Sequence, residues 1–210
     1  MYEICHHPSD PTLVAHAAGR LSPAAATVVR LHLELCATCR AAMREAEAIG
    51  GALLACLPAE PLGPEALARA MRRIDAADAA GRMGPPVPAA PPLTREVLAA
   101  QRLRWLAPGV RHCVVLDGTG GEVLRLLRVR PGTALPQHGH HGTELTLVLE
   151  GAFRDVAGHY RAGDVLEVDE ETRHMPAAEG PTDCFCLLAT QGRLRFDALL
   201  PRIFGLLVRL

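Results

Sequence analysis

The sequence predicts an α+β protein of two domains, in which a small helical bundle precedes an all-β barrel. Three observations lead to this prediction. Helix-type patterns fill the first part of the chain, and short runs rich in Val and Leu, separated by Gly, Pro and Asp, fill the second. A proline-rich stretch lies between them. At 210 residues the chain is long enough for two domains of ordinary size.

The boundary between the two parts lies at residues 79–92, AAGRMGPPVPAAPP. Five prolines in this stretch fix φ and remove amide donors, which is typical of a semi-rigid linker. We therefore expect a helical domain over residues 1–78, a linker over 79–92 and a β domain over 93–210.

Helix-start signals predict four helices in the first domain. Ser9 and Ser22 are suitable N-caps, Pro23 fits the first position of the second helix, and Gly19 would end the first. The expected helices cover about 9–18, 22–35 and 40–56, with a fourth from after 63–64 to about 78.

Turn signals such as Glu150-Gly151 divide the second domain at the spacing of an all-β barrel. The segment 152–162 is short enough for a compact hairpin. The apolar segment 198–210 fits either a short helix or a strand, and its pattern does not choose between them. The expected strands are Val114–Leu116, Val123–Val129, Leu145–Leu149, Val165–Val168 and Cys184–Ala189.

Charge and hydropathy exclude two classes of protein. The net charge is −1, and residues 1–57 carry five acids against four Arg, so the basic surface that nucleic acid requires is missing. The longest apolar runs are far shorter than the ~20 residues that cross a bilayer, and the start lacks a signal-peptide pattern. Seven Cys, several beside His, indicate metal-binding thiolates in a reducing cytoplasm.

The first cluster with ligand spacing is His32-x3-Cys36-x2-Cys39. Residues four apart on a helix share a face, and a Cys-x-x-Cys corner can turn back to the same point. A tetrahedral zinc site needs a fourth ligand, for which His6 and His7 are the first candidates and Cys5 is a weaker one. The alternative is that these are ordinary buried Cys and His. A domain this small has a weak core, which structural zinc would stabilise.

This part of the chain resembles the zinc-binding anti-sigma domain of bacterial extracytoplasmic-function sigma regulators. The resemblance lies in the opening HHPSD, followed by a capped helix and then His-x3-Cys-x2-Cys. The resemblance implies that the ligand of the opening His pair is its second member, His7. The implied zinc set is therefore His7, His32, Cys36 and Cys39, and its role is structural.

The second cluster, Gly132-x5-His138-x-His140-x3-Glu144-x6-Gly151, matches the first cupin motif at each fixed position. His138 and His140 are two apart, so they face the same way from a strand, and Glu144 begins the next strand. His141 would face outward. A polar turn is the alternative interpretation of this histidine-rich segment.

In the cupin family the fourth ligand is a His on a later strand, here His174. The second motif departs from the family pattern, since Asp169, Glu171 and Ala178 replace its usual Pro, Gly and Asn. Three imidazoles and one carboxylate suit zinc or another divalent transition metal, and ligand type alone does not choose among them.

Cys184 and Cys186 alternate in a strand-like run, so both thiols face one side. Three interpretations are open: core packing, then a redox reporter near the metal, then an alternative ligand set.

The chain resembles the ChrR-type anti-sigma factors over nearly its whole length. The resemblance lies in the order of the two halves, in the proline-rich linker between them and in the segment TELTLVLEGAFRD. The resemblance implies that the helical domain binds an extracytoplasmic-function sigma factor in a 1:1 complex and keeps it from RNA polymerase. It further implies that the cupin senses an oxidative signal, such as singlet oxygen or a hydroperoxide, and releases the sigma factor.

The competing hypothesis is a cupin metalloenzyme, such as a dioxygenase, with an accessory zinc domain. An enzyme needs an open metal position with acid or base groups beside it, and the sequence offers no clear additional pair. We therefore assign no catalytic residues. Co-purification with a sigma factor favours the regulator, whereas turnover of a small substrate favours the enzyme.

Overall fold

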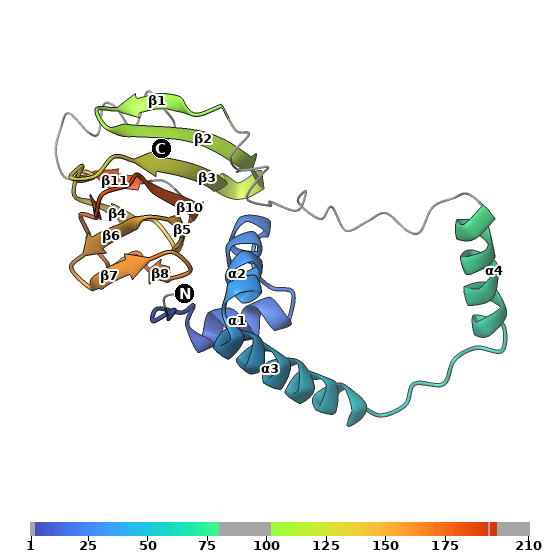
Figure 1. Ribbon diagram of the computed structural model, residues 1–210. Coiled ribbons are helices and arrows are strands. Elements are labelled where there is room, and N and C mark those ends of the chain that lie inside the picture. The colour runs from blue at the N-terminus through green and yellow to red at the C-terminus, as the bar shows by residue number, and fades with distance from the viewer. Residues whose placement is uncertain (1–2, 80–101, 193, 197–210) are drawn as a thin grey trace.

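The computed structural model describes residues 3–79, 102–192 and 194–196 (Figure 1). The predicted linker beyond residue 79 and the terminal segment 198–210 therefore lie outside the described residues. The four expected helices are confirmed, as α1 (Asp10–Ala17), α2 (Pro23–Leu35), α3 (Ala37–Ala55) and α4 (Ala66–Ala79).

The predicted caps define the helix ends. The side chains of Ser9 and Ser22 accept hydrogen bonds from the backbone amides of Thr12 and Ala25. Between α2 and α3 only Cys36 is extended, and its Sγ accepts a hydrogen bond from the amide of Cys39. The third helix therefore begins at Ala37, earlier than expected, because the Cys-x-x-Cys corner is itself its first turn.

The β domain is built from three antiparallel sheets. The strand order is β1-β2-β3-β10-β5-β8 in the six-stranded sheet, β7-β6-β9 in the second and β11-β4 in the third. Each expected strand lies within one observed strand, and the predicted hairpin is the pair β6–β7. The strands are β1 (Arg104–Ala107), β2 (Val110–Asp117), β3 (Glu122–Val129), β4 (His138–His140), β5 (Glu144–Glu150), β6 (Ala152–Asp155), β7 (Gly158–Arg161), β8 (Val165–Val168), β9 (Ala177–Glu179), β10 (Cys184–Gln191) and β11 (Leu194–Phe196), with a 3-10 turn η1 at Thr119–Gly121.

The central strands β3, β10 and β5 of the six-stranded sheet are buried on both faces. On the outer face, Leu147 of β5 and Leu187 of β10 share a core with Val28 of α2. On the inner face, Val148 and Cys186 belong to a second core between the sheets. Each Leu or Val buried in this way contributes about 1.5–3 kcal/mol. The helical domain therefore packs directly on the barrel, because α2 covers the outer face of this sheet.

Barrel side chains also hold the ends of the helices. The Glu122 carboxylate accepts a hydrogen bond from the amide of Ala24 at the start of α2. The Glu167 carboxylate accepts hydrogen bonds from Ser9 and Thr12 at the start of α1. A carboxylate at a helix N-terminus is favoured by the helix dipole, so these contacts fix the direction of both helices against the barrel.

The far end of α3 and all of α4 lie away from this shared core (Figure 1). Every residue from Glu47 to Glu65 is exposed. Among the described helices, none has both the length and the apolar character needed to cross a membrane.

Candidate metal centres

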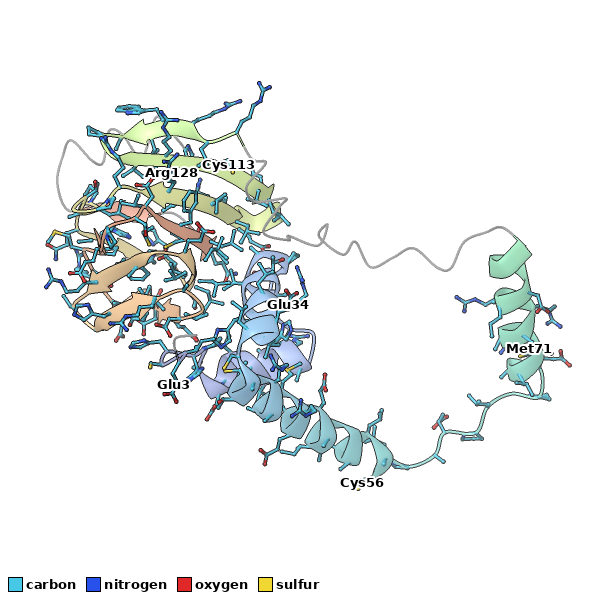
Figure 2. All side chains as sticks on the ribbon, in the orientation of Figure 1. Glu3, Glu34, Cys56, Met71, Cys113 and Arg128 are labelled. Atoms are coloured by element: carbon cyan, nitrogen blue, oxygen red, sulfur yellow. The ribbon has the colours of Figure 1, made fainter. Side chains whose placement is uncertain are left out.

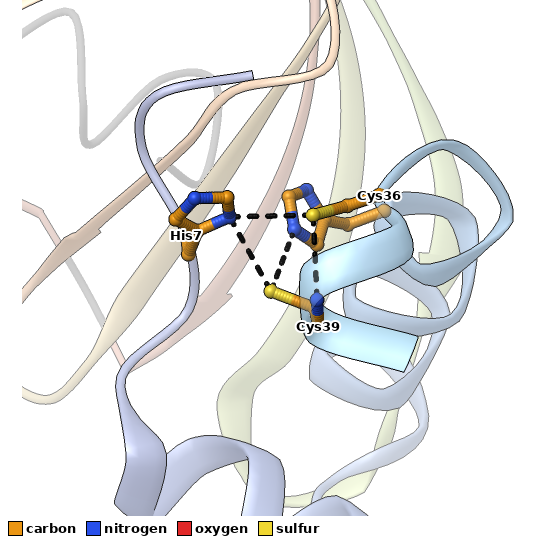
Figure 3. A group of neighbouring side chains, drawn as sticks. His7, Cys36 and Cys39 are labelled. Atoms are coloured by element: carbon orange, nitrogen blue, oxygen red, sulfur yellow. Dashed lines mark hydrogen bonds between the residues drawn. The ribbon is translucent and has the colours of Figure 1, made fainter. Parts of the chain in front are cut away.

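The structure brings the four predicted ligands of the helical domain together. His7 Nδ1 lies 3.4 Å from the Sγ atoms of both Cys36 and Cys39, and His32 Nε2 lies 3.2 Å from Sγ of Cys39 (Figure 3). All four donor atoms lie within 4.8 Å of one another. His7 precedes α1, His32 lies in the last turn of α2, and the cysteines occupy the corner.

These distances fit a tetrahedral zinc ion. Zn–S bonds of ~2.3 Å and Zn–N bonds of ~2.0–2.1 Å at tetrahedral angles place N and S ligand atoms about 3.5 Å apart. Burial raises the pKa of the Cys39 thiol to about 12, and Cys36 adds to this shift. Burial lowers the pKa of His32. Without a cation Cys39 and His32 are therefore neutral, and zinc would bind as the thiols release their protons.

The other candidates for the fourth ligand face elsewhere. The ring of His6 packs on Tyr160 with centroids 4.3 Å apart, and its Nδ1 lies 3.5 Å from Asp164. Cys5 is exposed, and its Sγ lies 3.5 Å from the carbonyl of Glu3. The geometry thus favours His7, as the family resemblance implies.

Three histidines converge inside the barrel. His138 and His140 lie on β4, and His174 forms an isolated bridge opposite His138. Nε2 of His140 lies 3.0 Å from Nε2 of His174. His138 Nδ1 donates a hydrogen bond to the carbonyl of Pro136 (2.8 Å), and His174 Nδ1 donates one to Asp155 (2.7 Å). With Nδ1 protonated, each of these two rings presents the lone pair of Nε2.

The protonation of these rings suits metal binding. Burial, with a further contribution from the neighbouring histidines, lowers the pKa of His138 to about 4 and that of His140 to about 3. Both rings are therefore neutral at pH 7, which is the form that binds a metal.

Glu144 lies beside the three histidines, but it is not part of the closely spaced group that they form. Its Oε2 is 3.6 Å from His140 Nδ1, and its Oε1 accepts a hydrogen bond from Thr146. Burial raises the pKa of Glu144. The buried Oε2 has no hydrogen-bond partner among the described residues, which is costly unless a cation compensates it. The residues present thus fit a divalent metal.

Asp155 is a functional candidate that the sequence analysis missed. Its side chain is 1% exposed and fixes the ring of His174. A signal was available, because Phe153 and Asp155 are two apart on β6 and share its buried face. An acidic side chain that points from a strand into the barrel needs a hydrogen-bonding partner there.

Asp155→Asn is expected to weaken metal binding in the barrel about 10–100-fold, because a partner that orients a ligand usually contributes that much. Competition with a chromophoric chelator measures the affinity. Glu179→Gln is the matched control, since Glu179 pairs with Arg154 and His159 at the surface. Equal affinities for the two variants would contradict this role.

The cysteine pair is buried and reduced. Sγ of Cys184 and Sγ of Cys186 are 3.4 Å apart, and the hydrogen bond between them, together with burial, raises the pKa of Cys186 well above its usual value. Both line a cavity of about 40 Å³ that also borders His138, Glu144 and His174. This volume suits about one water molecule, so the cavity leaves little room for an organic substrate.

Antiparallel sheets that enclose three converging histidines are typical of a cupin with a candidate metal site, here joined to a helical domain with a His2Cys2 cluster. Residues 94–193 match the family model described as the ChrR cupin-like domain. The anti-sigma-E factor ChrR of Cereibacter sphaeroides is 44% identical over 208 residues, which are 95% of this chain and 96% of that relative. The chain belongs to the family of ChrR-type anti-sigma factors.

A solved structure extends this similarity to the arrangement of both domains. The crystal structure of Rhodobacter sphaeroides SigE in complex with the anti-sigma ChrR contains a chain 41% identical to this one. The match covers 90% of this chain and 99% of that chain, with a TM-score of 0.74.

Proposed function

We propose that this chain binds an extracytoplasmic-function sigma factor in a 1:1 complex and inhibits it in the cytoplasm, without touching nucleic acid or membrane. Its family membership supports this function, since a relative of nearly the same length is the anti-sigma-E factor ChrR and another is bound to SigE. One observation in this chain carries the proposal furthest, namely the exposed apolar side chains on α3 and α4, two helices that stand apart from each other (Figure 1).

This surface, the sigma-docking face, consists of apolar side chains at helical spacing on two helices. Leu53 and Leu54 on α3 are 66% and 70% exposed. Met71 projects from α4 into solvent (Figure 2). Apolar side chains exposed together along a helix are typical of a protein-binding site. The face comprises Ile49, Leu53 and Leu54 of α3, Leu57 just after that helix, and Leu67, Met71 and Ile74 of α4.

Leu54→Asp or Met71→Asp is expected to weaken sigma binding about 10–100-fold. Each substitution removes an apolar side chain whose burial in the complex would contribute ~1.5–3 kcal/mol. Calorimetry with the purified sigma factor measures the affinity. Val156→Asp is the control, since Val156 is 83% exposed but lies on the barrel. Full affinity of both helix variants would show that this face is not the binding surface.

The proposed metal sites are zinc on His7, His32, Cys36 and Cys39, and zinc or another divalent transition metal on His138, His140, Glu144 and His174. We propose that the barrel senses an oxidative signal, such as singlet oxygen or a hydroperoxide. The convergence of barrel ligands from separate strands supports this role, because a change at one ligand would affect several strands.

We propose a regulator in place of the alternative metalloenzyme. The cavity of about 40 Å³ beside the histidines supports this choice, as does the family. We also propose the domain limits 1–78, 79–92 and 93–210, supported by the proline content of the middle segment. Co-expression with a sigma factor and its reporter tests the function. Loss of reporter activity and co-purification of the pair are expected, and turnover of a small substrate would favour the enzyme.

A further inference from the structure

The barrel contacts the helical metal cluster directly. The His32 ring, which is fully buried, donates a hydrogen bond from Nδ1 to the carbonyl of Gly163 over 2.8 Å. This bond leaves Nε2 free to face the cysteines. The acceptor belongs to the turn between β7 and β8, 131 residues further along the chain.

The position of this carbonyl is tightly defined. Gly163 has φ of +99°, where a side chain is strained, and a Cβ there would lie 2.8 Å from the side chain of Ile4. The segment that precedes α1 thus packs directly over the turn. A glycine is required both by the backbone and by this close approach.

The same turn holds the segment that carries His7. Asp164 Oδ1 accepts hydrogen bonds from the amides of Cys5 (2.8 Å) and His6 (3.0 Å). The amide of Val165 donates to the carbonyl of His6 over 3.1 Å. On the other side of His7, the amide of Ser9 donates to Glu167 over 2.8 Å. His7 therefore lies in an extended segment fastened to the barrel on both sides.

The surroundings of Asp164 suit this role. It is buried, and its Oδ2 accepts a further hydrogen bond from the amide of Arg161 over 2.8 Å. Burial alone would raise the pKa of Asp164, but the amides of Arg161, His6 and Cys5 lower it. The carboxylate is thus ionised at neutral pH and receives amides from both domains.

We propose that Asp164 and the Gly163 carbonyl are positioning groups of the helical zinc site, so that the barrel orients two of its four ligands, His7 and His32. The inference rests on the proposed zinc ligands and is independent of the sigma factor. It assigns the β7–β8 turn a role outside the barrel's own metal site. The helical site is therefore complete only while the two domains are docked.

The test uses the full-length protein loaded with zinc and no sigma factor. Zinc transfer to the dye 4-(2-pyridylazo)resorcinol is followed over time, and the phase missing in Cys36→Ser is assigned to the helical site. Asp164→Asn is expected to speed that phase about 10–100-fold, as loss of a ligand-orienting partner does. The phase from the barrel site is expected to stay unchanged and shows that the barrel is folded.

Asp183→Asn is the matched control, because it removes the same charge from a carboxylate that pairs with Arg128. Glu167→Gln is a second variant, expected to act in the same direction on the other side of His7. With Co²⁺ in place of zinc, the d–d bands of the helical site should change in Asp164→Asn and not in Asp183→Asn, since they report ligand geometry.

A folded Asp164→Asn protein with the wild-type transfer rate and wild-type Co²⁺ bands would overturn the inference. Absence of a Cys36-dependent phase in the wild type would overturn the ligand set, and this inference with it. Failure to bind a sigma factor would affect neither measurement.

Discussion

Replacing Cys36 or Cys39 by Ser is expected to remove about one equivalent of zinc and to abolish inhibition of the sigma factor, because a closed tetrahedral site loses one of four ligands. Structural zinc contributes roughly 10–16 kcal/mol in zinc-finger peptides, more than a typical domain's whole stability. Both cysteines lie at the corner that sets the direction of α3, and α3 carries half of the sigma-docking face. Zinc content by mass spectrometry and a sigma-dependent reporter measure the two effects.

Cys5→Ser is the matched control for these variants. Cys5 is exposed and lies close in sequence to His7, yet its thiol is not part of the His2Cys2 group. The Cys5→Ser protein should retain its zinc and should still inhibit the sigma factor. A Cys36→Ser or Cys39→Ser protein that still inhibits at wild-type strength would refute a structural role for this zinc.

Alanine at His138 or Glu144 is expected to leave inhibition intact without oxidant and to blunt induction when the oxidant arrives. The sigma-docking face lies on α3 and α4, so the basal complex does not need the barrel metal. To change the ratio of released to bound sigma factor from 1:99 to 99:1, the signal must shift the free-energy difference between the two states by ~5.5 kcal/mol. Loss of a metal ligand is one of the few local events of that size. Metal content and reporter induction under a hydroperoxide or photosensitised singlet oxygen measure the result.

His141→Ala is the control for the barrel variants, because His141 follows His140 directly but is exposed, as the sequence predicted. It should bind metal and respond as the wild type does. The idea fails if a His138→Ala or Glu144→Ala protein is soluble, free of barrel metal and still fully inducible.

Local signals predicted much of this structure. Ser9, Ser22 and Pro23 located the starts of α1 and α2, because capping depends on a few adjacent residues. His32, Cys36 and Cys39, and likewise His138, His140 and Glu144, could be proposed because their ligand spacing is short-range information. His7 and His174 came from the family patterns that the sequence resembles. The strand β4 was predicted from the ligand motif alone, because its inward residues are His138 and His140 and its sequence lacks an apolar pattern.

The relation between the two halves could not be predicted from the sequence. The run Leu145–Leu149 is apolar except for Thr146 and lacks a regular polar alternation, which is typical of a strand buried on both faces. Nothing local indicates that α2 covers one of those faces. The role of Gly163 was equally hidden, because the group that contacts His32 is a backbone carbonyl, which every residue has.

The docking of α2 on the barrel has a consequence for synthesis of the chain on the ribosome. The N-terminal helices emerge first, yet their carboxylate caps, Glu122 and Glu167, and their core partner Leu187 are translated long afterwards. At ~5–20 residues per second, roughly 7–30 seconds pass between the synthesis of α2 and that of β10. During that interval their apolar faces are open to chaperones or to a sigma factor, so the nascent chain is expected to meet partners before it is complete.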